Sequence, residues 1–247
     1  MICSFTISLK PLEFGKKILK YNLDKDIFSI FLEEGVTNEE LKNLSISNFL
    51  TKDKFIGERN YSIRISSISS EVTLKILKIL FFKRMYNEKV IIYETEFLIS
   101  NVYHNNRYSD QFDLESFLEL PLYQEVSINF LTPTFFKFGD RFFEELKIEY
   151  FFKNISTKLK KSSLNDKSLV KENIDFKNII LKKISLKKVD IKTFKTNGFV
   201  GEVHFIFNED NEEKLRFLNL LVYFSKFSCV GYGCEKGFGQ VEISFMK

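Results

Sequence analysis

The sequence predicts an α+β fold with two tandem ferredoxin-like (βαββαβ) domains and a C-terminal glycine-rich loop. Three observations support this prediction. A chain of 247 residues suits one or two domains, the predicted strands and helices follow the order β-α-β-β-α-β, and that order occurs twice. Hydrophobic residues make up 44% of the chain, which is enough for ordinary globular cores. The predicted domains are residues 1–120, including a linker, and residues 121–247.

Alternating apolar residues predict the strands of the first domain, and apolar residues at helical spacing predict its helices. Ser70 is a favourable N-cap for a helix that runs through Tyr86, and Gly35 is a favourable end for the helix before it. A linker rich in Asn, Asp and Ser is expected over residues 103–120. The predicted elements are strands at 2–9, 44–50, 61–68 and 89–102 and helices at 16–34 and 70–86.

The second domain repeats this order and contains an unusual glycine cluster. Its predicted strands are 126–131, 179–193, 199–207 and 241–245, and its predicted helices are 142–159 and 212–227. Glycine permits positive φ and the close approach of a phosphate or of another backbone, and successive N–H groups can bind an anion. The cluster is therefore either an anion-binding loop or a tight helix-to-strand connection. Its glycines are Gly231, Gly233, Gly237 and Gly239.

Positive charge is concentrated in one segment of the second domain. Residues 153–195 contain thirteen lysines and four acidic residues, a net charge of +9, whereas the whole chain carries only +4. A basic patch attracts polyanions, so RNA or DNA is the first expected partner. The alternative interpretation is a solvated, lysine-rich loop.

The cysteines and histidines of the chain indicate its cellular compartment and limit the metal chemistry to be expected. Cys3, Cys229 and Cys234 form no CxxC pattern and are odd in number, so a disulfide framework or a zinc site is not expected and a reducing cytoplasm is the predicted location. His104, His204 and the scattered carboxylates lack metal-ligand spacing, so neither a metal nor a cofactor is expected. No signal peptide or apolar run of about 18 residues is present, so no membrane association is expected.

Several sequence blocks resemble one known family. GFVGEVHF (198–205) and VGYGCEKGFGQVEI (230–243) resemble the CRISPR-associated endoribonuclease that cuts repeat RNA into guide RNAs, the sixth numbered Cas family of the RAMP superfamily. Its glycine-rich loop likewise ends in Gly-Phe-Gly before the last strand. FLTPTF (130–135) resembles the strand end that opens the family's second domain, and KNLSIS (42–47) resembles a lysine leading into its second strand. The blocks span most of the chain in the family's order.

The resemblance implies an enzyme that cuts pre-crRNA without a metal. In this family the substrate's own 2′-hydroxyl attacks the scissile phosphate, and the products carry a 2′,3′-cyclic phosphate and a 5′-hydroxyl. Such a site must align the hydroxyl, move protons and stabilise a charged phosphorane.

The resemblance also assigns catalytic candidates. Lys42 matches the cation that stabilises the phosphorane, and Tyr21 lies on the first helix, where a family tyrosine orients the 2′-hydroxyl. Many members have a histidine in an acidic glycine turn after the first helix, but residues 31–35 (FLEEG) have none, so Glu33 or another group must replace it or the base is absent. His104, in the linker, is the remaining candidate for proton transfer. The alternative role of Tyr21 is core packing, and the alternative for Lys42 and His104 is simple exposure to solvent.

The RNA-binding candidates combine the glycine-rich loop with nearby cations. Lys236 is the cation within the loop, and Arg141 and Lys137 flank the predicted start of a helix, where phosphates bind favourably. Lys52 and Lys54 follow the second strand and are candidates to bind phosphate or to replace the missing base. The glycine candidates are Gly231, Gly233, Gly237 and Gly239.

Three other functions remain open at this point. The first is a non-cleaving CRISPR repeat-RNA-binding protein of the same fold, because the family histidine is absent. The second is a backbone subunit of a CRISPR effector complex. The third is a generic ferredoxin-like protein that binds a small molecule. For the preferred function the expected partners are CRISPR repeat RNA and, beyond it, an effector complex, and the expected state is a monomer or homodimer.

Overall fold

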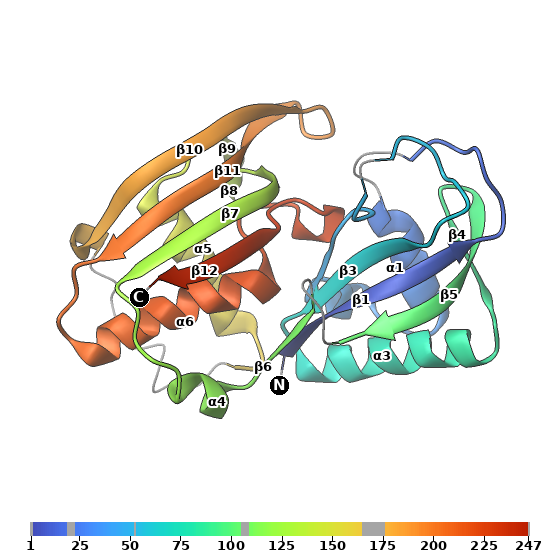
Figure 1. Cartoon of the computed structure of the whole chain (residues 1–247), viewed down its shortest axis with the longest axis horizontal. Helices are drawn as coiled ribbons and strands as arrows, with labels where there is room; N and C mark the ends of the chain where they lie inside the picture. The colour runs from blue at the N-terminus through green and yellow to red at the C-terminus, as the bar shows by residue number, and fades with distance from the viewer. Residues whose placement is uncertain (1, 19–22, 52, 105–108, 165–175, 247) are drawn as a thin grey trace. The chain divides into compact units, whose positions relative to one another are not determined.

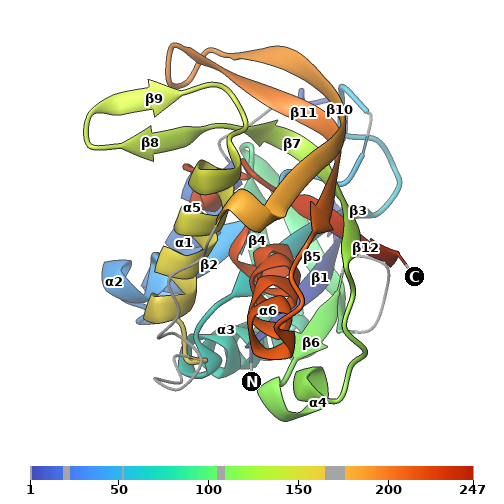
Figure 2. The same ribbon diagram turned by 90° about the vertical axis from the view of Figure 1, so that its left-hand side faces the viewer.

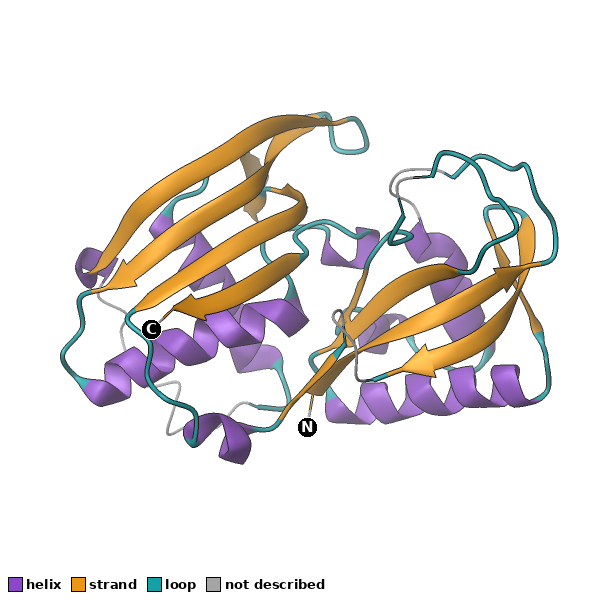
Figure 3. Ribbon diagram, viewed as in Figure 1, coloured by secondary structure: helices purple, strands orange, loops and turns teal. Residues whose placement is uncertain are grey.

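The chain folds into two compact units. The computed structural model describes residues 2–18, 23–51, 53–104, 109–164 and 176–246 (Figure 1). The first unit consists of residues 1–112 together with 235–237, and the second consists of residues 113–234 and 238–247. Each unit contains a main antiparallel sheet accompanied by helices, which confirms the predicted α+β class (Figure 3).

The main sheet of the first unit has the strand order β2-β3-β1-β5-β4, and β6 pairs with the start of β1. Within it, β2-β3-β1-β5 together with α1 and α3 is the ferredoxin-like arrangement. The elements are β1 (Ile2–Pro11), α1 (Leu23–Glu33), α2 (Asn38–Leu41), β2 (Leu44–Ile46), β3 (Tyr61–Ser67), α3 (Ser70–Met85), β4 (Lys89–Ile92), β5 (Thr95–Tyr103) and β6 (Asp110–Phe112).

Three local predictions for this unit were wrong. The expected strand at 89–102 is a hairpin, because Tyr93 and Glu94 both take positive φ and turn the chain between β4 and β5. Tyr-Glu is not a turn signal, so periodicity alone could not find this turn. Ser69, not Ser70, is the N-cap of α3, since its hydroxyl accepts the N–H of Val72. Lys17 forms a β-bridge, so the start of the expected helix at 16–34 is not helical.

The main sheet of the second unit has the order β10-β11-β7-β12, which again is the ferredoxin-like order. Helices α5 and α6 cover one face of this sheet, and a separate β8–β9 hairpin projects from it (Figure 2). The elements are α4 (Leu114–Leu118), β7 (Glu125–Thr134), β8 (Phe136–Phe138), β9 (Arg141–Phe143), α5 (Ile148–Lys161), the 3-10 turn η1 (Phe176–Asn178), β10 (Ile179–Ile191), β11 (Thr196–Phe207), α6 (Glu212–Ser228), the 3-10 turn η2 (Cys234–Lys236, shared with the first unit) and β12 (Val241–Met246).

Phenylalanine rings form much of the core of the second unit. Phe130 on β7 is buried and lies 5.0 Å from the ring of Phe199 and 6.4 Å from that of Phe151. Phe205 on β11 packs against Phe151 and Phe152 of α5. These large aromatic side chains bury apolar area between this helix and the sheet.

The predicted helix at 142–159 starts later than expected. Residues 136–143 form the β8–β9 hairpin around Gly139, which has a φ of 58°, and α5 begins only at Ile148. Lys137 and Arg141 therefore lie on the two strands of a hairpin and not at a helix N-terminus. The argument that a helix dipole would help them bind phosphate is wrong for this chain.

Replacing Phe130 by Ala should lower the free energy of unfolding by about 3–5 kcal/mol, because it leaves a cavity among buried rings. Urea denaturation followed by circular dichroism measures this loss. The matched control is Phe81→Ala on α3, whose side chain is 46% exposed, and its expected loss is below about 1 kcal/mol. An equally small loss for Phe130→Ala would contradict the proposed core.

Candidate functional site

The glycine-rich loop, residues Val230–Gly239, is held to the end of β7 by backbone hydrogen bonds. The N–H of Tyr232 donates to the carbonyl of Phe135 at 2.9 Å, and the N–H of Gly239 donates to that of Pro133 at 3.2 Å. The N–H of Val230 donates to the carbonyl of Gly239 at 2.8 Å and so closes the loop at its base. Two of the sequence blocks that carried the family resemblance therefore lie against each other.

Close chain packing explains two of the loop glycines. Gly239 has a φ of +71°, and a Cβ there would overlap the carbonyl of Val230. Gly231 has a φ of +86°, and a Cβ there would overlap the carbonyl of Phe135. Any other residue at these positions would push apart the backbone segments that shape the loop. The close approach of two backbones, one of the two alternatives considered for the cluster, thus accounts for Gly231 and Gly239.

Helix α5 fixes the first half of the loop through two polar side chains. The amide of Asn154 accepts the N–H of Gly231 at 2.9 Å and donates to its carbonyl at 3.4 Å. The ammonium of Lys158 donates to the carbonyls of Ser228, Cys229 and Gly231 at 3.1–3.2 Å. These carbonyls lie at the end of α6 and just after it, where helix carbonyls lack partners and a cation is favourable. The loop is therefore shaped before any ligand arrives.

Cys229 and Cys234 form a disulfide across the first turn of the loop, with their Cα atoms 6.0 Å apart. The expectation that the cysteines would form no disulfide is wrong for this pair. A spacing of five residues belongs to no common disulfide or metal motif, so the spacing alone does not predict this bond. The positive φ of Cys229 at the end of α6 turns the chain so that the two side chains meet.

An exposed aromatic residue of the loop, Tyr232, lies beside a cation that the sequence had identified. The Tyr232 side chain is partly exposed, and the ammonium of Lys137 lies 5.2 Å from its ring centroid. Lys137 also lies 5.5 Å from the ring of Phe142. An exposed ring with an adjacent cation can stack on a base while the cation meets a phosphate. Tyr232 is not among the residues predicted from the sequence, although its position between two glycines is a usable signal for an exposed aromatic residue.

The basic segment contributes exposed lysines on the edge strand β10. Lys182, Lys183, Lys187 and Lys188 are all exposed there. Two of them are partly neutralised, because Lys182 pairs with Glu125 at 3.3 Å and Lys188 pairs with Glu144 at 3.0 Å. Arg141 at the start of β9 is also exposed. Charged edge strands also prevent pairing with other chains, so β10 serves solubility as well as any anion binding.

Two catalytic candidates of the first unit, Lys42 and His104, do not lie together. Lys42 caps the end of α2 and forms an exposed ion pair with Glu39. His104 is exposed directly after β5. In the antiparallel sheet both lie at the same end, but β3 and β1 separate β2 from β5, which places the strands about 14 Å apart. Tyr21 and Lys52 lie outside the described residues.

Residues 235–237 of the glycine-rich loop belong to the first unit and lie at the opposite end of β2 from Lys42. Gly237 is so close to this unit that a Cβ would lie 3.1 Å from the carbonyl of Ile46. Lys42 precedes that strand, so the strand separates it from Gly237 and its neighbour Lys236. Lys54 is exposed in the segment that follows β2.

A buried carboxylate near Lys236 was not identified from the sequence. Asp24, in the first turn of α1, is only 6% exposed, and its Oδ1 has no hydrogen-bond partner. Burial raises the pKa of the Asp24 carboxyl, while the Lys236 ammonium acts in the opposite direction. Nearby, Asp26 accepts the N–H of Tyr93 at 2.8 Å, and the hydroxyl of Tyr93 donates to Asn48 at 2.9 Å. Burial also raises the pKa of Tyr93.

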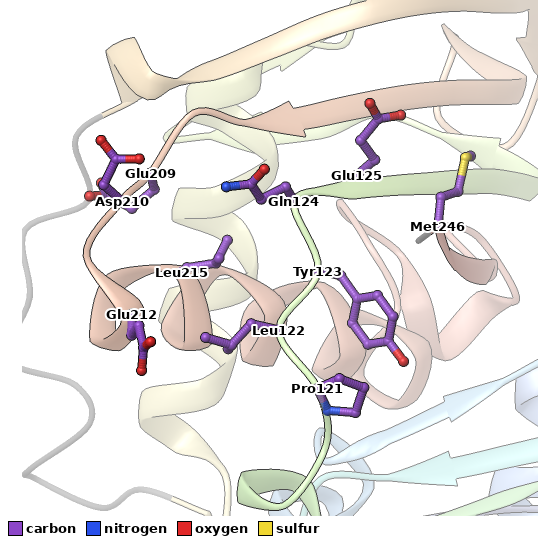
Figure 4. A pocket seen from close by; sticks show the side chains of 10 residues that line it. All are labelled: Pro121, Leu122, Tyr123, Gln124, Glu125, Glu209, Asp210, Glu212, Leu215 and Met246. Atoms are coloured by element: carbon purple, nitrogen blue, oxygen red, sulfur yellow. The ribbon is translucent and has the colours of Figure 1, made fainter.

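The second unit also contains a cavity of about 730 Å³ (Figure 4). Four of its lining residues are acidic, which makes it unfavourable for phosphate. His204 lies on β11, within the strand predicted at 199–207, and its Nε2 is 3.2 Å from Oε2 of Glu125. The cavity is lined by Pro121, Leu122, Tyr123, Gln124, Glu125, Glu209, Asp210, Glu212, Leu215 and Met246.

Within the described ranges, no group of three His, Cys, Asp or Glu side chains is arranged to hold a metal ion. No described helix combines the length and the apolar composition that a bilayer crossing requires.

Comparison with known proteins relates this geometry to one family. The family model of the CRISPR-associated endoribonuclease Cas6 matches residues 128–241, from β7 to the start of β12. The predicted family resemblance is confirmed. The Cas6 match covers the β8–β9 hairpin, both helices of the second sheet and the whole glycine-rich loop. The sequence matches none of the curated proteins.

Solved Cas6 structures share the fold over the full chain. A Cas6 product complex superposes with a TM-score of 0.78 at 16% identity, covering 99% of this chain and 100% of that chain. Cas6 from Thermus thermophilus gives 0.70 at 16% identity, with 99% and 98% covered. A Cas6-related protein from Pyrococcus furiosus gives 0.62 at 15% identity, with 100% of each chain covered. The Cas6-like fold therefore includes both units.

Replacing Asp24 by Asn should raise the free energy of unfolding near neutral pH by about 1 kcal/mol, because it removes a buried charge with an unpartnered oxygen. The raised pKa means that the folded chain binds this proton more tightly than the unfolded chain. Wild-type stability therefore falls as pH rises from the ordinary carboxyl pKa through the raised value. Urea denaturation of the wild type and of Asp24→Asn should show that the difference between their free energies of unfolding becomes smaller towards acidic pH.

The control for this experiment is Asp26→Asn, which weakens an acceptor for the N–H of Tyr93 and should give no gain in stability. If Asp24→Asn lowers the free energy of unfolding near neutral pH as much as Asp26→Asn does, the buried carboxylate of Asp24 does not destabilise the folded protein.

Proposed function

We propose that this protein is an endoribonuclease that binds CRISPR repeat RNA and cuts the precursor RNA into guide RNAs. The observation that carries the proposal is the glycine-rich loop, which matches the Cas6 family model in sequence and is anchored on β7 and α5. The shared fold with Cas6 structures, among them a product complex and a substrate mimic complex, supports it.

RNA binding would rest on the loop and on exposed cations around it. Tyr232 and Lys137 provide a ring and a charge side by side, which suits a base and its phosphate. Arg141 on the β8–β9 hairpin and Lys187 and Lys188 on β10 add exposed cations toward the end of β7 that carries the loop. Lys182 and Lys183 lie toward the other end of the sheet. Lys236 adds a cation from the loop's second half. Such contacts predict affinity that falls steeply with salt.

Cleavage would use the substrate's 2′-hydroxyl as nucleophile and need no metal. Lys42 is the proposed electrostatic stabiliser, since its exposed ion pair with Glu39 contributes little and can be exchanged for a phosphate. Tyr21 is proposed to orient the hydroxyl. His104 is proposed to transfer a proton, which requires it to move toward the phosphate that Lys42 contacts, because the strands next to the two residues lie about 14 Å apart. Alignment of the 2′-hydroxyl by bound RNA would supply much of the rate enhancement.

A non-cleaving RNA-binding protein is the second candidate. The turn after α1 contains no histidine, and the Glu34 carboxylate in it is paired with Lys83 at 2.7 Å, which ties that side chain to a structural role. The cytoplasmic location, an effector complex as a further partner and the choice between monomer and homodimer stay predictions.

The deciding measurement is a cleavage assay on the repeat RNA of the host CRISPR locus with EDTA present. We expect cleavage in EDTA, products with a 2′,3′-cyclic phosphate, and no cleavage of a substrate with a 2′-deoxy group at the cut site, because that group is the nucleophile. Tight binding with no cleavage would instead support the non-cleaving candidate. Absence of binding at low salt would contradict both.

Lys42→Ala should reduce the single-turnover cleavage rate by about 10²–10³-fold and change the RNA dissociation constant far less, because it removes stabilisation of charge that develops only in the transition state. Filter binding and single-turnover kinetics on the same RNA measure the two effects.

Lys236→Ala serves as the matched variant with the opposite expectation. It should weaken binding and lower the slope of log affinity against log salt by about 1, as expected for one lost phosphate contact. Lys75→Ala, which breaks the ion pair with Glu40, is the neutral control. Equal losses of rate and affinity for Lys42→Ala would remove its catalytic role.

A further inference from the structure

The disulfide in the glycine-rich loop lies next to a cation. The ammonium of Lys158 is 3.0 Å from Sγ of Cys234 and 3.5 Å from Sγ of Cys229. The same ammonium contacts the carbonyls of Ser228, Cys229 and Gly231, which hold it in place. A neighbouring ammonium stabilises a thiolate, which is the form of cysteine that reacts with oxidants and disulfides. The structure thus places an activating group at the cysteine pair.

The two cysteines differ in accessibility. Cys229 is 2% exposed at the end of α6, whereas Cys234 is partly exposed at the start of η2 and is closer to Lys158. A reactive redox thiol is accessible, stabilised as the thiolate and adjacent to a second cysteine that resolves the first oxidation product. Cys234 meets the first description and Cys229 the second. Cys3 is buried in the first unit and has no such partner.

We propose that Cys234 and Cys229 are a reversible redox modification site that sets the rigidity of the glycine-rich loop. A hydroperoxide oxidises the Cys234 thiolate to a sulfenic acid and is itself reduced to water or an alcohol. The Cys229 thiol then attacks that sulfur, forms the disulfide and releases water. A dithiol reductant reverses the reaction by thiol–disulfide exchange. The reductant is oxidised to its own disulfide, and Cys229 and Cys234 return to thiols.

The bond acts on the part of the loop that α5 shapes. The cross-link closes the ring around Val230, Gly231, Tyr232 and Gly233 and so restricts this turn. In the reduced protein non-covalent contacts alone hold the same turn. Among them are the hydrogen bonds that Asn154 and Lys158 make with Gly231 and the hydrogen bond from the N–H of Tyr232 to the carbonyl of Phe135. Restriction of a binding loop in its bound shape raises affinity by lowering the ordering cost. Resting on the proposed function, the oxidised form should bind repeat RNA more tightly than the reduced form.

The first test uses the full-length wild-type protein, either treated with dithiothreitol or reoxidised with hydrogen peroxide. Alkylation followed by mass spectrometry should show Cys229 and Cys234 free after reduction and joined after oxidation, with Cys3 unchanged as the internal control. In Cys229→Ser, dimedone should trap a sulfenic acid at Cys234, whereas in Cys234→Ser no adduct should form at Cys229. Lys158→Gln should slow the oxidation of Cys234 about tenfold.

Hydrogen exchange and RNA binding then test the consequence. We expect slower amide exchange for residues 230–234 in the oxidised form and a repeat-RNA dissociation constant about three- to tenfold lower than in the reduced form. The proposed redox site would be overturned if Cys229 and Cys234 were alkylated to the same extent after reduction and after oxidation. It would also be overturned if amide exchange of residues 230–234 were the same in the two forms. Changed exchange with equal RNA affinity would overturn its effect on binding. Changed exchange with no RNA binding in either form supports the redox site and contradicts the proposed function instead.

Discussion

The candidate site depends on the hydrogen bonds that side chains of helix α5 make with the glycine-rich loop and the end of α6. Asn154 holds both backbone groups of Gly231, and Lys158 gathers three carbonyls at the end of α6. The loop's base is closed by the Val230–Gly239 hydrogen bond, which leaves no room for a side chain at Gly239. A helix, a strand end and a loop that are distant in sequence are therefore positioned by a small set of polar contacts.

This arrangement changes how the family motif is understood. Gly231 and Gly239 are explained by the approach of two backbone segments of the same chain, and FLTPTF supplies the carbonyls that the loop meets. The motif thus specifies a loop shape. It does not specify a base or an acid, which is why a match to it is compatible with the missing histidine and with either proposed function.

A buried carboxylate next to the glycine-rich loop lowers the stability of the fold. Asp24 is buried with an unpartnered oxygen near Lys236, which costs stability and is the kind of local inconsistency that functional sites retain. Around the acidic cavity, by contrast, Glu125 is paired with Lys182 and His204, and Glu209 accepts a hydrogen bond from Asn178. These contacts have an evident structural role, so the cavity gives less reason to expect a function.

The sequence by itself determined the two repeats, most strands and helices, and the basic and glycine-rich segments, because periodicity and composition are local properties. It could not determine the β4–β5 turn at Tyr93, the β8–β9 hairpin at Lys137 and Arg141, or the disulfide between Cys229 and Cys234. Each of these depends on backbone angles fixed by contacts with distant residues. Only the tertiary structure separated Lys42 from Gly237 by a strand, buried Asp24 and set Lys158 beside two sulfurs, because through-space distances and burial arise only once the sheets and helices have packed.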